Sequence, residues 1–284
     1  MNNKYDIAIA YRIYPGVSKV PPVFHDDKLR LSELCLYSFK ESLSDLKFKI
    51  FVLLDNCPDI YTDLFKKYFS DDELELIRLD GIGNAETFKM QMDLLLKQDY
   101  SDYIYFAEDD YFYLPRQFRD MLKLIKINPQ VDFATPYDHI DYYRMPIHKQ
   151  FRQDIIKSGQ RDWKTVSTTT MTFITNKETL KKVYSNFYTY TRGNADASIW
   201  LSLTKHKVKN PFLIIKYYFI DKLWFKLFAK AWYYSIKQIW FGGKYQLWSP
   251  TPSIATHMDN KCLAPGVDWG DVFRNTKEKI NFVS

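Results

Sequence analysis

Short apolar runs alternate along the first half of the chain with segments whose apolar residues recur at helical spacing. The runs are typical of strands buried on both faces, and the spaced segments are typical of helices. The predicted strands are 5–13, 48–57, 74–80 and 102–110, and the predicted helices are 28–43, 59–69, 84–98 and 116–129. This order predicts βαβ units, hence an α/β fold with a mostly parallel sheet flanked by helices, and ligand sites at the carboxyl ends of the strands.

The second half of the chain is less regular. Residues 131–138 and 166–175 predict strands, and 177–187 and 194–206 predict helices. Asn84 and Asn194 stand where the N-cap residue of a helix is expected.

Aromatic residues are unusually frequent, with 22 Tyr, 21 Phe and 7 Trp, or 18% of the chain. Such rings suit sugar-binding subsites or a membrane interface. The three cysteines, Cys35, Cys57 and Cys262, are odd in number and show no metal-ligand spacing, so we expect no disulfide framework and a reducing cytoplasmic location.

The N-terminal residues predict a first strand rather than a signal peptide, and no apolar stretch reaches the roughly 20 residues of a membrane span. The net charge of +6 is unevenly placed. Residues 203–247 contain nine lysines and a single acid, Asp221, which gives this segment a charge of +8.

Three consecutive carboxylates, Glu108, Asp109 and Asp110, end the predicted strand 102–110 between aromatic residues. Acids that are partly buried together repel one another, so a positive partner is expected. Hard oxygen ligands at a strand end suit Mg²⁺ or Mn²⁺, which would neutralise a phosphate-bearing substrate. The alternative is a solvated turn between a strand and a helix.

Four segments occur in an order that resembles the nucleotide-sugar domain of GT-A glycosyltransferases, particularly the bacterial family-2-like enzymes. The similarity lies mostly in residues 5–140, and the segments are "FVLLDNCPD", "YFAEDDYFYLP", "GNADASIW" and "PSIATHM". The acidic triplet is similar to the DXD motif of that family, although it reads EDD. The acceptor-side acidic pair of the family is reduced here to the single carboxylate of Asp196.

The resemblance implies a role for each matching residue. Asp110 would coordinate the metal, with Glu108 or Asp109 contacting ribose or the water shell of the metal. Asp55 would contact the base or ribose, Tyr11 and Arg12 would line the nucleotide pocket from a loop, and Asn84 would lie on the cofactor-binding side. The expected donor-site residues are thus Tyr11, Arg12, Asp55, Asn84, Glu108 and Asp109.

Two further residues are expected near the chemistry. Asp196 would be the general base that deprotonates an acceptor hydroxyl, which gives a single displacement with inversion; alternatively it only complements a helix dipole. His257 would be a second metal ligand, which favours Mn²⁺ over Mg²⁺, or else a structural residue. His139 and His148 are weaker alternatives.

The sequence shows no internal repeat, low-complexity tract or linker, so one catalytic domain with a C-terminal elaboration is expected. Residues 1–210 would form the catalytic domain, with a nucleotide-sugar half at 1–115 and an acceptor half at 116–210. Residues 211–247 would form a basic, aromatic helical elaboration, and residues 248–284 would return to the active site.

Residues 212–241 predict one amphipathic helix, because Lys222, Lys226, Lys230 and Lys237 share one face and bulky apolar residues share the other. The apolar face either packs on the catalytic domain or contacts an anionic membrane surface, where each basic residue contributes about 1 kcal/mol. No nucleic-acid-binding module accompanies the charge, so nucleic acid is not an expected partner.

The sequence therefore predicts a metal-dependent, inverting glycosyltransferase, located in the cytoplasm and attached peripherally to the inner face of the cell membrane. It would move a sugar from a nucleotide-diphosphate sugar to a hydroxyl of a glycan or lipid-linked acceptor in bacterial surface polysaccharide synthesis. Two alternatives remain: a nucleotidyltransferase on a similar α/β fold, and a non-catalytic sugar-binding protein.

Overall fold

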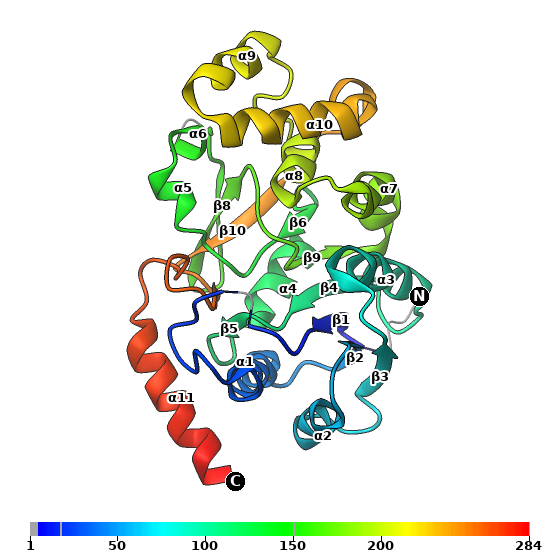
Figure 1. The fold of residues 1–284 in the computed structure, drawn as a ribbon, viewed down its shortest axis with the longest axis vertical. Helices are drawn as coiled ribbons and strands as arrows, with labels where there is room; N and C mark the ends of the chain where they lie inside the picture. The colour runs from blue at the N-terminus through cyan, green and yellow to red at the C-terminus, as the bar shows by residue number, and fades with distance from the viewer. Residues whose placement is uncertain (1–4, 18, 150, 284) are drawn as a thin grey trace.

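A nine-stranded sheet with helices on both faces forms the centre of the computed structural model, which describes residues 5–17, 19–149 and 151–283 (Figure 1). The strand order is β3-β2-β1-β4-β9-β6-β10-β8-β7, and a separate pair is formed by β11 and β5. The strands are β1 Ile7–Ile13, β2 Phe48–Asp55, β3 Leu74–Leu79, β4 Tyr103–Glu108, β5 Tyr111–Tyr113, β6 Phe133–Ala134, β7 Ile155–Ser158, β8 Arg161–Val166, β9 Phe173–Asn176, β10 Leu247–Thr251 and β11 Ala255–His257. The helices are α1 Lys28–Leu43, α2 Asp59–Tyr68, α3 Gly83–Lys97, α4 Phe118–Ile127, α5 Asp141–Arg144, α6 Pro146–Lys149, α7 Lys177–Tyr188, α8 Asp196–Thr204, α9 Pro211–Ile220, α10 Lys222–Phe241 and α11 Trp269–Val283, with a 3-10 turn at Thr189–Arg192.

The strand directions confirm the predicted α/β class and its mostly parallel sheet. β1 pairs in parallel with both β2 and β4, and β2 pairs in parallel with β3. Beyond β4, only β9 and β8 run against the other strands of the large sheet. The carboxyl ends of β1, β2 and β4 consequently lie at one edge of the sheet, where polar residues were predicted to gather.

The central strand β1 divides its side chains between two apolar layers. Ile7, Ile9 and Tyr11 join the layer that includes α1, whereas Ala8 and Ala10 join the layer that includes α3 and α8. Because neighbouring residues of a strand point to opposite faces, Tyr11 and Arg12 cannot both face one pocket.

Several local predictions were wrong. The helices α3 and α8 begin at Gly83 and Asp196, so neither Asn84 nor Asn194 is the N-cap residue. Residues 166–175 are not one strand, since β8 ends at Val166 and β9 begins at Phe173.

The predicted amphipathic helix at 212–241 is broken at Asp221 into α9 and α10. Asp221 ends α9, and its carboxylate accepts hydrogen bonds from Leu223 N (2.9 Å) and Trp224 N (3.3 Å), which caps α10. On α10, Trp224 and Phe228 are buried in an apolar cluster with residues of α6 and α8. The α10 helix therefore packs on the rest of the protein, as one of the two alternatives expected.

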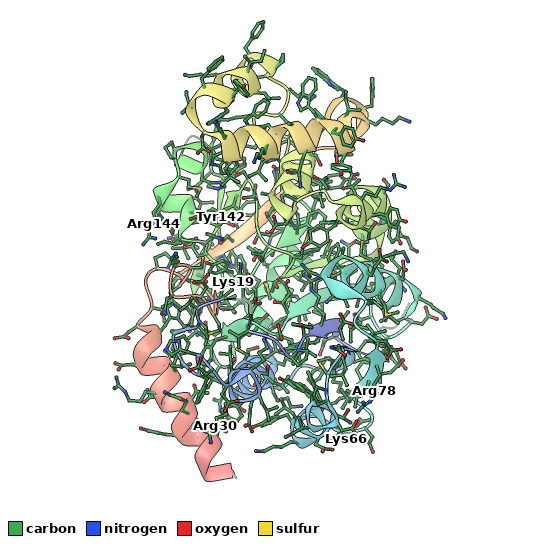
Figure 2. All side chains as sticks on the ribbon, viewed as in Figure 1. Lys19, Arg30, Lys66, Arg78, Tyr142 and Arg144 are labelled. Carbon is green, nitrogen blue, oxygen red and sulfur yellow. The ribbon has the colours of Figure 1, made fainter. Side chains whose placement is uncertain are left out.

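The α9 helix differs from α10 because none of its residues is buried. Phe212 and Phe219 are 81% and 80% exposed, and Ile215, Tyr218 and Ile220 are exposed beside them. Side chains of α9 project from the body of the molecule at the end opposite α11 (Figure 2). Among the described residues, no helix is both long enough and apolar enough to cross a membrane.

Candidate active site

The three acids lie at the carboxyl end of β4, the strand where the parallel part of the sheet meets the antiparallel strand β9. Glu108 is the last residue of β4, and Asp109 and Asp110 form the turn into β5. β5 pairs antiparallel with β11, which places His257 opposite Tyr111. The C-terminal strand β11 thereby lies beside the acidic turn.

Glu108 is paired with Arg12 of the adjacent strand β1. The second oxygen of Glu108 accepts a hydrogen bond from Thr172 Oγ1 at 2.7 Å, and Arg12 also donates to Asn84 O at 2.7 Å. Both carboxylate oxygens of Glu108 are therefore engaged within the protein. Its geometry fits the positioning of Arg12 better than a direct contact to ribose.

Asp109 is paired with Lys28, the first residue of α1, at 2.7 Å. Its Oδ2 also accepts a hydrogen bond from Tyr14 N at 3.3 Å. Burial raises the pKa of Asp109, whereas the charge of Lys28 opposes the rise and Asp110 adds to it. This contact fixes the loop after β1 against the acidic turn.

Asp110 is paired with His257, whose Nε2 lies 3.0 Å from Asp110 Oδ2. Burial alone would raise the pKa of Asp110, but the charge of His257 and its hydrogen bond lower it to about 2. Burial likewise opposes ionisation of His257, yet Asp110 raises the pKa of His257 to about 10. The two side chains form an ion pair across the β5–β11 ladder.

Each of the three acids thus has its own basic partner within the chain. One acceptor is nevertheless left over. Within the described residues, the buried oxygen Oδ1 of Asp110 accepts no hydrogen bond. A buried carboxylate oxygen without a partner is costly, and it is a suitable ligand atom for a divalent cation. Asp110 and His257 therefore fit a metal site.

Asp55 ends β2 and is directed at the connection between β3 and α3. Its two oxygens accept hydrogen bonds from Ile82 N (2.8 Å) and Gly83 N (2.9 Å) at the start of α3. Gly81 and Gly83 have φ of 73° and 83°, a conformation that favours glycine and that shapes this connection. Asp55 lines the pocket, but its carboxylate is engaged in holding the helix N-terminus.

Asp196 begins α8 on the other side of the site from Asp55. Its Oδ1 accepts a hydrogen bond from Ala197 N at 2.6 Å. Burial raises the pKa of Asp196, the hydrogen bond opposes this, and the charge of Glu108 adds to it. Nearby, Tyr190 accepts a hydrogen bond from Asn84 Nδ2 at 2.8 Å, which joins the two sides of the site.

These side chains line one cavity of about 690 Å³, a volume typical of sites for small ligands. It brings together most of the residues that the sequence singled out, from β1, β2, α3, β4, α8 and β11. The predicted residues that line it are Arg12, Asp55, Asn84, Glu108, Asp109, Asp110, His139, Asp196 and His257.

Two candidates lie elsewhere. Tyr11 is in strand β1 rather than in a loop, is 1% exposed, and packs against Phe39 and Phe65, so it does not line the cavity. His148 is buried beside Ser167, with its Nδ1 2.9 Å from Ser167 Oγ, and is also absent from the cavity wall.

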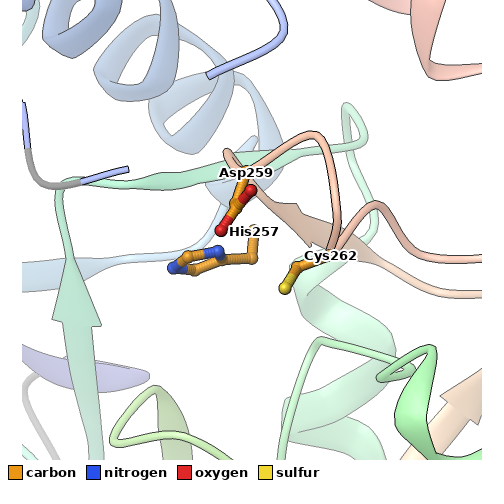
Figure 3. A group of neighbouring side chains, drawn as sticks. All are labelled: His257, Asp259 and Cys262. Carbon is orange, nitrogen blue, oxygen red and sulfur yellow. The ribbon is translucent and has the colours of Figure 1, made fainter. Parts of the chain in front are cut away.

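The cavity also contains residues that sequence reasoning missed. Lys19 and Lys28 supply positive charge, and Thr170 and Tyr190 supply hydroxyl groups. No local pattern marks these residues, because each reaches the site through the tertiary fold. Asp259 and Cys262 are different, since together with His257 they form an H-x-D-x-x-C pattern (Figure 3). Cys262 thus lies close to two other potential metal ligands, a grouping that the sequence analysis did not identify.

Comparison with known proteins finds similarity only among solved structures. No family model and no curated protein sequence matches the chain. TarS from S. aureus is 15% identical, with a TM-score of 0.40, over 63% of this chain and 49% of that chain. The mannosyltransferase PcManGT from Pyrobaculum calidifontis, solved in complex with GDP-Man and Mn²⁺, is 14% identical, with a TM-score of 0.40, over 64% of this chain and 47% of that chain.

A 4-diphosphocytidyl-2C-methyl-D-erythritolsynthase from Anaerococcus prevotii is 13% identical, with a TM-score of 0.43, over 70% of this chain and 82% of that chain. The match spans about half the length of TarS and of the mannosyltransferase.

Proposed function

We propose that the chain is a metal-dependent, inverting glycosyltransferase that uses a nucleotide-diphosphate sugar. The observation that carries the proposal is the convergence, in one cavity, of a candidate metal pair, basic side chains and a separate, half-buried carboxylate. Asp110 and His257 form the pair, and Asp196 is the carboxylate. The cavity of about 690 Å³ is large enough for a donor of this size.

The donor diphosphate would lie against Asp110 and His257. A divalent ion held there, Mn²⁺ or Mg²⁺, would supply charge stabilisation to the departing nucleoside diphosphate. The imidazole of His257 favours Mn²⁺. Arg12 is held by Glu108 and the carbonyl of Asn84, so its positive charge is fixed at the floor of the cavity. Lys19 on the wall adds a further positive charge.

Asp196 would act as the base on the acceptor side. The acceptor oxygen attacks the anomeric carbon, the bond from that carbon to the diphosphate oxygen breaks, and the acceptor proton passes to the carboxylate of Asp196. A displacement in one step inverts the configuration at the anomeric carbon. The burial that raises the pKa of Asp196 makes it a stronger base than an exposed aspartate.

The acceptor in this proposal is a glycan or lipid-linked glycan at an anionic membrane surface. The α9 helix supports this part, since Phe212, Ile215 and Phe219 are exposed on it. Exposed Lys216 and Lys222 lie on the same helix and just beyond its end. An apolar surface flanked by lysines is typical of a helix that lies in the headgroup region.

The catalytic proposal is tested by product analysis with a panel of nucleotide-diphosphate sugars. Release of nucleoside diphosphate that requires Mn²⁺ and stops with EDTA is expected. Asp110→Asn should abolish metal-dependent donor binding, whereas Asp196→Asn should bind donor normally and lower transfer by about 10²–10⁴-fold. Release of pyrophosphate from a nucleoside triphosphate would instead indicate a nucleotidyltransferase, and donor binding without release would indicate a non-catalytic protein.

The membrane part is tested by sedimentation with vesicles that contain anionic lipid. We expect binding that weakens as salt rises and that falls strongly in the Phe212→Ser/Phe219→Ser variant. Ile155→Ser is the matched control, because Ile155 is an exposed apolar residue on β7 and away from α9. Equal binding of the two variants would contradict a role for α9.

A further inference from the structure

Three side chains able to bind a metal meet on the turn after β11. One ligand atom from each of His257, Asp259 and Cys262 lies within 4.8 Å of the other two (Figure 3). Cys262 N donates to Asp259 O at 2.8 Å, and Lys261 N donates to Asp259 Oδ1 at 3.1 Å. The backbone of the turn therefore holds Asp259 and Cys262 close to the end of β11.

The imidazole of His257 has one nitrogen engaged and one left over. Nε2 lies 3.0 Å from Asp110 Oδ2. Nδ1 is buried and makes no hydrogen bond within the described residues. A buried polar nitrogen without a partner is costly, so a ligand for Nδ1 would stabilise the ring. Cys262 is not in a disulfide. The Tyr137 hydroxyl donates a hydrogen bond to the backbone carbonyl of Cys262, which helps to fix the position of this residue.

We propose that His257, Asp259 and Cys262 form a Zn²⁺ site, with His257 contributing Nδ1. Thiolate, imidazole and carboxylate bind zinc at about 2.0–2.3 Å, which places tetrahedral ligand atoms about 3.5 Å apart. Side-chain movements of about 1 Å would close the observed triad to that geometry. Mg²⁺ and Mn²⁺ prefer oxygen ligands, so the thiolate selects zinc. Binding releases the thiol proton of Cys262 and the Nδ1 proton of the His257 imidazolium, whose Nε2 stays paired with Asp110.

The zinc site shares His257 with the metal pair of the proposed transferase. The zinc site itself does not depend on the proposed function, but the effect of zinc on Mn²⁺ binding does. Zinc on Nδ1 holds the ring that Asp110 contacts through Nε2. Two cations bridged by one imidazole repel each other. Zinc occupancy therefore weakens Mn²⁺ binding at Asp110, which makes the enzyme sensitive to zinc.

Cobalt substitution tests the zinc site without any activity measurement. In the full chain, Co²⁺ should produce a thiolate-to-cobalt charge-transfer band that zinc abolishes. Cys262→Ser should remove the band. It should also weaken zinc binding, measured by competition with a chromophoric chelator. Because loss of an outer-shell partner weakens metal binding about 10–100-fold, loss of a direct ligand should weaken it more. Asp259→Asn should also weaken zinc binding. A wild-type protein without the band, or a Cys262→Ser variant that keeps it, would overturn the proposal.

Two further variants locate the cobalt. Cys57→Ser is the matched control and should keep the band, because Cys57 lies just after β2, outside the triad. Asp110→Asn should also keep it, whereas loss of the band in that variant would overturn the assignment to a separate site. Zinc should weaken Mn²⁺ binding in the wild type and leave it unchanged in Cys262→Ser. Absence of any Mn²⁺ binding would contradict the proposed transferase, while the cobalt band decides the zinc site on its own.

Discussion

Replacing Asp55 with asparagine should loosen the start of α3 at the edge of the cavity. The carboxylate accepts hydrogen bonds from Ile82 N and Gly83 N at 2.8 and 2.9 Å, and Asp55 is 4% exposed. Asparagine keeps one acceptor oxygen and places an amide group, which is a donor, against the other N–H. One backbone donor is left without a partner, and the negative charge at the helix N-terminus is lost.

The size of the effect follows from these two losses. A hydrogen bond to a charged group contributes about 1.5–3 kcal/mol, and a charge at a helix N-terminus contributes about 0.3–1 kcal/mol. The free energy of unfolding should therefore fall by about 2–4 kcal/mol, a large part of the about 5–15 kcal/mol that is typical of a folded protein.

Urea denaturation measures the free energy, and hydrogen exchange of the Ile82 and Gly83 amides locates the change. Both amides should exchange faster in Asp55→Asn than in the wild type. Asp80→Asn is the matched control, since Asp80 is an exposed acid at the start of the same connection and should shift stability by less than about 0.5 kcal/mol. Unchanged protection of both amides in Asp55→Asn would refute the reasoning.

Three other predictions concern the ion pairs and the candidate base. Arg12→Met should lower the free energy of unfolding by about 3–5 kcal/mol, because it leaves Glu108 buried without its partner. The exposed Arg30→Met is the control, and equal urea midpoints for the two variants would contradict this prediction. Turnover at saturating donor should fall as the pH decreases. The pKa of this fall should lie above that of a free aspartate, which is about 3.9, because burial raises the pKa of Asp196. If the fall at low pH persists in Asp196→Asn, Asp196 is not the group that titrates. In metal-free protein, the stabilisation by the His257–Asp110 pair should be fully present below about pH 6.5 and should be lost as the pH rises to about 10. Thermal melts at several pH values should show this loss in the wild type and not in His257→Gln.

The N-terminal half of the fold was predictable because its elements are separate and strongly patterned. The helix at 28–43 matches α1, and the strands predicted at 48–57 and 102–110 are present, each ending two residues earlier, at Asp55 and Glu108. The alternation within β1 was not informative, since every residue of that strand is buried. Which of Tyr11 and Arg12 faces the cavity is decided by Glu108, on a strand about 96 residues away.

Other features carried local signals that the sequence reasoning did not use. β7 and β8 form a hairpin through Gly159, whose φ is 65°, and a glycine between two strand-like runs is typical of such turns. α11 begins after Asp268, whose carboxylate accepts from Asp271 N at 3.2 Å, and it places Trp269 and Phe273 against Phe112. These apolar residues stand four positions apart, as on one face of a helix.

One basic partner of the acidic turn could not be predicted from the sequence. Lys28 reaches Asp109 from a position with no distinguishing pattern, whereas His257, which was expected at the site as a metal ligand, is paired with Asp110. The break at Asp221 was also missed, because the lysines continue at helical spacing and only the capping contacts of Asp221 separate α9 from α10. An ion pair between residues far apart in the sequence leaves no local pattern. At Asp221 the cap of α10 outweighs a helical periodicity that continues on both sides of it.

The central claim is that Asp110 and His257 hold a divalent ion against the diphosphate of a sugar donor. Anomalous diffraction from crystals that contain Mn²⁺ and a nucleoside diphosphate tests it most directly. We expect one manganese peak at coordination distance from Asp110 and His257 and in contact with both phosphates. No peak at that position, or a nucleotide bound outside the cavity, would contradict it.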